Sequence, residues 1–130
     1  MIDLKIRTKT FAIDCWKVCN IFPYERGYNA FVNQLIRCSS SVGANYRASQ
    51  RSKSDADFIN KLKIVEEEAD ESQYFLELLL EVNTIKNETL NTELKRLISE
   101  ANELVAIFVS IIMKRKNYIN AEIETKNKNS

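Results

Sequence analysis

Apolar residues recur at alternating spacings of four and three along most of this chain. Four such runs can be followed, from Leu4 to Phe22, Phe31 to Ser49, Phe58 to Asn83 and Leu90 to Ile111. This spacing is typical of helices that pack along a shared seam. The chain holds only two glycines and one proline, whereas a sheet protein of its length needs many more turn residues. The sequence therefore predicts an all-α fold.

The breaks between the runs predict where the helices begin and end. Pro23 and Gly27 mark a turn, Ser54 and Asp57 resemble a capping box, and Asn87 is a plausible cap. We expect helices at about 3–22, 29–49, 54–83 and 88–116. Their short links favour antiparallel neighbours, and hence one up-down-up-down four-helix bundle over residues 1–116. Residues 117–130 are predicted to be a frayed helix end and a solvated polar tail.

The content of reactive residues argues against catalysis and metal binding. Histidine, the commonest general base near neutral pH and a frequent metal ligand, is absent. Cys15, Cys19 and Cys38 are interpreted as core side chains and free thiols in a reducing cytoplasm. No apolar run approaches the roughly 20 residues that span a bilayer. We expect no catalytic residue, no metal, no cofactor and no membrane partner.

Charge is distributed unevenly although the net charge is only +1. Residues 1–53 carry nine Lys/Arg against three Asp/Glu, and residues 54–83 carry two against nine. The basic side chains on the second helix, the link after it and the start of the third are candidate nucleic-acid contacts. These are Arg37, Arg47, Arg51, Lys53, Lys61 and Lys63. The alternative is a solvated charged face without a ligand.

Several features point to contacts between copies of the chain. A glycine within a helix costs roughly 1 kcal/mol relative to alanine, so Gly43 is either a tolerated defect or a place of close helix approach. On the heptad assignment Ser40, Gly43 and Ala44 lie away from the seam. Residues 104–113 are apolar nearly all round, which one bundle cannot bury. The predicted interface is Ser40, Gly43, Ala44, Glu67, Asp70, Glu71, Val105, Val109 and Ile112.

The middle of the chain carries a recognisable pattern. It consists of SSVGANYR at 40–47, SKS at 52–54, FINKL at 58–62, IVEEEADES at 64–72 and LELL at 76–79. This pattern resembles the four-helix-bundle proteins encoded in 23S ribosomal RNA intervening sequences, over about residues 4–116. The accessory variability determinants of diversity-generating retroelements are similar to that family. Ala48 and Ser49 depart from the Glu-Ala that many members have.

The resemblance implies a ring-shaped homopentamer without enzymatic activity, and RNA, DNA or a reverse transcriptase as its partner. The first hypothesis is therefore a homo-oligomeric, nucleic-acid-associated adaptor. The alternative is a structural scaffold that recruits a protein partner, such as a reverse transcriptase, without binding nucleic acid. A salt titration separates the two, because phosphate contacts weaken steeply with salt.

Overall fold

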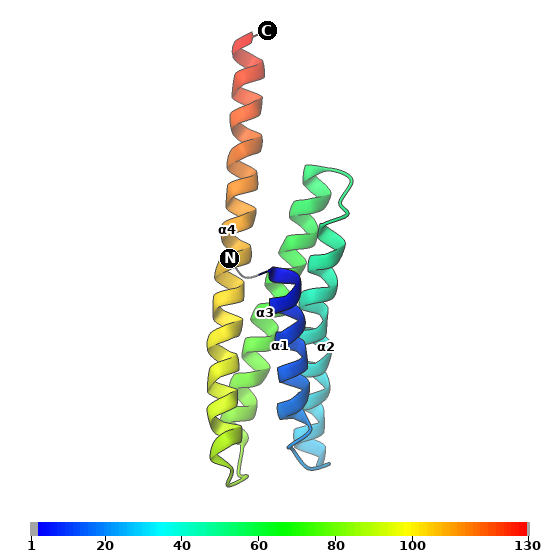
Figure 1. Ribbon diagram of the computed structural model, residues 1–130, viewed down its shortest axis with the longest axis vertical. Coiled ribbons are helices and arrows are strands. Elements are labelled where there is room, and N and C mark those ends of the chain that lie inside the picture. Colours follow the sequence, from blue (N-terminus) through cyan, green and yellow to red (C-terminus); the bar gives the residue numbers. More distant parts are fainter. Residues whose placement is uncertain (1–2, 130) are drawn as a thin grey trace.

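A computed structural model describes residues 3–129 and shows four helices. They are α1 (Leu4–Cys19), α2 (Arg26–Ser49), α3 (Asp55–Val82) and α4 (Glu88–Asn129). Residues 3–129 contain no strand. The chain direction alternates from each helix to the next (Figure 1). The predicted all-α four-helix bundle is confirmed. Met1, Ile2 and Ser130, which the predicted bundle and tail include, lie outside the described residues.

The turn between α1 and α2 lies three residues earlier than predicted, at residues 20–25 instead of 23–28. After Cys19, the amides of Ile21 and Phe22 donate to carbonyls only three residues back, at 3.1 and 3.2 Å, so the α-helical pattern ends there. Beyond Pro23, Glu25 is extended and its carbonyl accepts from Asn29 at 2.8 Å. This bond closes the first turn of α2, which begins at Arg26 instead of residue 29.

The predicted caps of α3 and α4 are confirmed. The Ser54 hydroxyl accepts the Asp57 amide at 3.1 Å, and the Asp57 carboxylate accepts the Lys53 amide at 3.2 Å. The Asn87 side-chain oxygen accepts the Leu90 amide at 3.0 Å. These bonds satisfy amides that have no partner within the helix, so the side chains fix where the two helices begin.

The end of α4 differs from the prediction of a frayed tail. The helix continues to Asn129 and rises beyond the ends of the other three (Figure 1). No glycine or proline follows Gly43 in the sequence, so the chain has no strong helix breaker there. Tyr118 donates to Glu122 at 2.9 Å and Thr125 to the Ala121 carbonyl at 3.0 Å, one turn apart in each case.

The core lies where the four seams meet. Leu35, Leu62, Leu76, Leu97 and Leu104 are fully buried. α1 and α3 each pack against α2 and α4, and the backbones of α1 and α3 do not come close to each other. They are therefore the diagonal pair of the bundle, and each has an outer face that no other helix of the chain covers.

The predicted apolar interface on α4 is partly wrong. Ile112 is only 5% exposed and belongs to the core, whereas Ile111, predicted to lie on the seam, is half-buried. The seam passes from Phe108 to Ile112 because a straight helix of 3.6 residues per turn drifts against a seven-residue repeat. Val105 packs partly against the core, and Val109 is 39% exposed. Only Val109 of the three points mainly outward.

Within residues 3–129, no helix combines the length and the apolar character that crossing a membrane requires.

Candidate nucleic-acid interface

Gly43 brings α1 and α2 together within one chain. A Cβ at this position would lie 3.1 Å from Thr8 Oγ1, closer than ordinary van der Waals contact. Thr8 is fully buried, and its hydroxyl donates to the Leu4 carbonyl at 2.7 Å. The heptad assignment, which placed Gly43 away from the bundle, is therefore wrong, because the helix that approaches Gly43 closely is α1 of the same chain. Ser40 and Ala44 beside it are exposed.

A groove of about 580 Å³ runs along this close approach. Ile6 lines it, together with the small residues Ser40, Gly43 and Ala44 of α2. Three cationic side chains line it, Lys5 and Lys9 from α1 and Arg47 from α2. Asp3 also lines it, but within residues 3–129 no carboxylate forms a salt bridge with any of the three cations.

Lys5 and Lys9 were not among the predicted contacts. They are four residues apart and so share one side of α1. That spacing, together with the basic first 53 residues, is the only sequence feature that could have indicated Lys5 and Lys9 as nucleic-acid contacts. Which side of α1 faces Arg47 depends on how α1 packs on α2. This packing cannot be predicted from the spacing of residues in the sequence.

Two of the predicted nucleic-acid contacts are engaged within the chain. Arg37 of α2 donates to Glu71 at 2.6 Å and to Glu68 at 3.2 Å, both on α3. Lys61 pairs with Asp57 at 2.9 Å, and this hydrogen bond lowers the pKa of the Asp57 carboxyl. Arg37 was predicted to contact nucleic acid, and Glu71 to contact another copy of the chain. They instead join α2 to α3 because the two helices are neighbours in the bundle.

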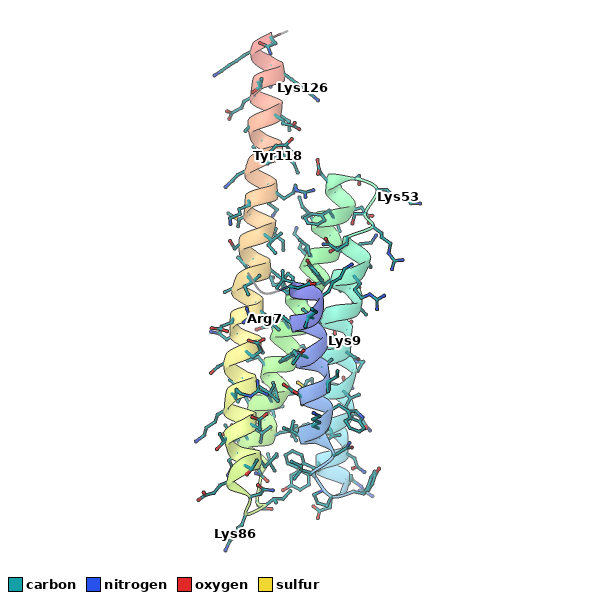
Figure 2. The ribbon with its side chains drawn as sticks, viewed as in Figure 1. Arg7, Lys9, Lys53, Lys86, Tyr118 and Lys126 are labelled. Atoms are coloured by element: carbon teal, nitrogen blue, oxygen red, sulfur yellow. The ribbon has the colours of Figure 1, made fainter. Side chains whose placement is uncertain are left out.

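Arg47, Arg51 and Lys53 are exposed and form no salt bridge among residues 3–129. Lys53 projects from the link at the end of the bundle (Figure 2). It lines a polar cleft of about 500 Å³ with Asp55, Phe58 and Arg115. Arg115 pairs with Asp55 at 2.8 Å and lies 4.0 Å above the Phe58 ring, so its charge is already partnered.

Lys63 lies apart from the other predicted cations. It lines a shallow groove of about 220 Å³ between α3 and α4, with Glu67 and Val109. The carboxylate of Glu67 is exposed there, as is that of Asp70 on the outer side of α3. The structure thus brings Arg47, Lys5 and Lys9 to one groove and leaves Lys63 in a separate, mixed-charge one.

The three thiols are buried between α1, α2 and the core, as predicted. Burial raises the pKa of Cys19 to about 12, and it raises the pKa of Cys15 and Cys38 above the usual range. Thiolate is the reactive form of cysteine. Because the raised pKa keeps these thiols protonated at neutral pH, they are unreactive there. Among residues 3–129 no three Cys, Asp or Glu side chains are grouped to hold a metal ion.

Comparisons with known proteins agree with the four-helix fold. The family described as "23S rRNA-intervening sequence protein" matches the chain over residues 3–110. A crystal structure of a protein of unknown function from the S23 ribosomal protein family of Bacteroides thetaiotaomicron is similar, with a TM-score of 0.73 and 31% identity. The match covers 85% of this chain and 98% of that one. No curated protein matches the chain.

Proposed function

The chain belongs to the family of 23S rRNA-intervening sequence proteins, and on this premise we propose that it is a non-enzymatic, homo-oligomeric adaptor that binds RNA or DNA. The single observation that supports nucleic-acid binding most directly is the set of cations without salt bridges near the α2–α3 link. Arg47, Arg51 and Lys53 lie there, and Lys5 shares the groove of Arg47. The site of action is the cytoplasm, and the oligomer is a ring of five copies.

The chemistry of this surface suits phosphates better than bases. Arginine and lysine side chains neutralise phosphate charge and release counterions. Three cations and one carboxylate line the groove, and no aromatic residue lines it on which a base could stack. One copy offers few contacts, but a ring repeats them, so the binding free energies of several copies add. The proposed interaction is therefore with the backbone and has little sequence preference.

Binding of labelled RNA and DNA across a salt series tests the proposal. The variant Arg47→Ala/Arg51→Ala should weaken binding and reduce the slope of log K against log salt by about 2 for each bound subunit on duplex DNA. Lys86→Ala/Lys95→Ala is the matched control, since it removes two exposed cations elsewhere. Equal losses in both variants, or no loss in the first, would contradict the assigned site.

A scaffold that recruits a protein partner is the second candidate. The exposed carboxylates of Glu67 and Asp70 on the outer side of α3 favour it, because they offer an acidic surface to a basic partner. A scaffold of this kind would bind neither RNA nor DNA, even at low salt. A protein such as a reverse transcriptase would then be retained by the parent chain and lost from Glu67→Lys/Asp70→Lys.

A further inference from the structure

α1 carries a second line of large side chains that the bundle leaves uncovered. Ile6 is 63% exposed, Ile13 44% and Trp16 54%. Together with Lys9 they are spaced three, four and three residues apart, which is the spacing of a helix-packing seam. We name Ile6, Lys9, Ile13 and Trp16 the outer seam of α1. The inner seam of the same helix, with Phe11 at its centre, is already buried in the core.

α3 carries a line of the same spacing with the opposite charge. Ile64 is 42% exposed and Tyr74 57%, and Glu67 and Glu71 lie between them. We name these four residues the outer seam of α3. The intervals between them are again three, four and three. Two helices of one chain therefore present matching outer seams, one with a lysine and the other with two glutamates.

The fold keeps these two seams apart within one chain. α1 and α3 are a diagonal pair of the bundle, and their backbones do not come close to each other. Their outer seams consequently point away from each other, and both helices run in the same direction (Figure 1). The seams can meet only when the α1 of one copy lies beside the α3 of another.

We propose that the outer seam of α1 packs in parallel against the outer seam of α3 of a second copy. This inference rests on the homo-oligomeric part of the proposed function and names the surfaces that meet. The matched spacing sets the register, with Ile6 against Ile64, Lys9 against Glu67, Ile13 against Glu71 and Trp16 against Tyr74. Isoleucine meets isoleucine, lysine meets glutamate, and the two aromatic residues pair at the far end. The fourth pair is not complementary, because Ile13 is apolar and the carboxylate of Glu71 already accepts a hydrogen bond from Arg37 of its own chain.

The flanking charges select this pairing over symmetric ones. Lys5 and Lys17 flank the outer seam of α1, whereas Asp70 and Glu77 flank that of α3. Pairing α1 with α1, or α3 with α3, would place like charges side by side, which is destabilising. The contact is therefore head-to-tail. Each copy then uses both of its seams, and the assembly closes into a ring or grows into a filament.

A charge exchange measured by light scattering, without nucleic acid, tests the contact. Lys9→Glu and Glu67→Lys should each lower the mass of the parent assembly toward that of one chain. The double variant Lys9→Glu/Glu67→Lys should restore the parent mass, because lysine and glutamate meet again. Lys95→Glu, an exposed charge reversal on α4, is the control and should assemble like the parent. Circular dichroism verifies that every variant is helical.

The possible outcomes separate this inference from the proposed function. If the parent assembles and both single variants assemble equally well, the outer seams are not the interface, although a homo-oligomer through another face stands. If the parent is a single chain at every concentration, both the contact and the homo-oligomer are wrong, and nucleic-acid binding is judged separately. Trp16 is the only tryptophan of the chain. A change in its fluorescence on adding RNA but not on dilution would assign this face to nucleic acid and overturn the contact.

Discussion

Replacing Gly43 with alanine measures how closely α1 and α2 approach each other. The added Cβ would lie 3.1 Å from Thr8 Oγ1 and 3.4 Å from Thr8 Cβ. Thr8 cannot easily move away, because it is fully buried and its hydroxyl is bonded to the Leu4 carbonyl. Alanine gains about 1 kcal/mol of helix propensity, and overpacking costs about 1–3 kcal/mol. We therefore expect Gly43→Ala to be neutral or destabilising by up to about 2 kcal/mol.

Removing the Thr8 hydroxyl should reverse the sign of this effect. In a Thr8→Ala background the nearest atom is gone, so Gly43→Ala should stabilise the protein by about 1 kcal/mol. The two substitutions should therefore be coupled by about 1–3 kcal/mol in a double-mutant cycle.

Urea unfolding followed by circular dichroism, at one fixed protein concentration, gives the four free energies. If Gly43→Ala stabilises the protein by the same amount in both backgrounds, α1 does not press on Gly43 and the reasoning is refuted. Gly43→Leu extends the series. Its longer side chain should lower the stability of the bundle itself, whatever the state of assembly.

Three further predictions concern other parts of the molecule. Because burial raises the pKa of Cys19 to about 12, the native thiols should react slowly with a disulfide reagent at pH 8 and quickly in denaturant; fast native reaction would contradict their burial. Arg7 joins α1 to Glu100 of α4 through two hydrogen bonds of 2.7 and 2.8 Å. Arg7→Ala should therefore cost about 1–3 kcal/mol in urea unfolding, more than the exposed control Lys95→Ala. The exposed end of α4 at 120–129 has no helix beside it, and short isolated helices are marginal in water. Its amides should exchange with deuterium much faster than those near Leu104, and equal protection would show that another chain covers it.

The helices and most of the core could be predicted from sequence alone. Leu62, Leu76 and Leu97 sit on seams whose spacing only a helix produces, and they are fully buried. The caps at Ser54 and Asn87 could also be predicted, because each side chain accepts a hydrogen bond from an amide only three residues ahead in the sequence. The pattern at residues 40–79 also indicated the family, and the match to 23S rRNA-intervening sequence proteins confirms it.

The candidate site depended on tertiary structure. Arg37 could be recognised as basic, but its pairing with Glu71 follows from the packing of α2 on α3. Lys5 and Lys9 join Arg47 in one groove because Gly43 lets α1 approach α2 closely. Such contacts join residues far apart in the chain, so no local pattern contains them.

The sequence by itself thus determined that this chain forms four amphipathic helices, where α3 and α4 are capped, and most of the stripe that each helix buries. Those properties follow from side chains within a few residues of one another. The tertiary structure alone decided the direction in which Gly43 faces, the burial of Ile112 and the neighbours of Arg37. Each of these depends on how one helix is rotated against the next. A heptad pattern fixes that rotation only coarsely, because 3.6 residues per turn do not match a seven-residue repeat.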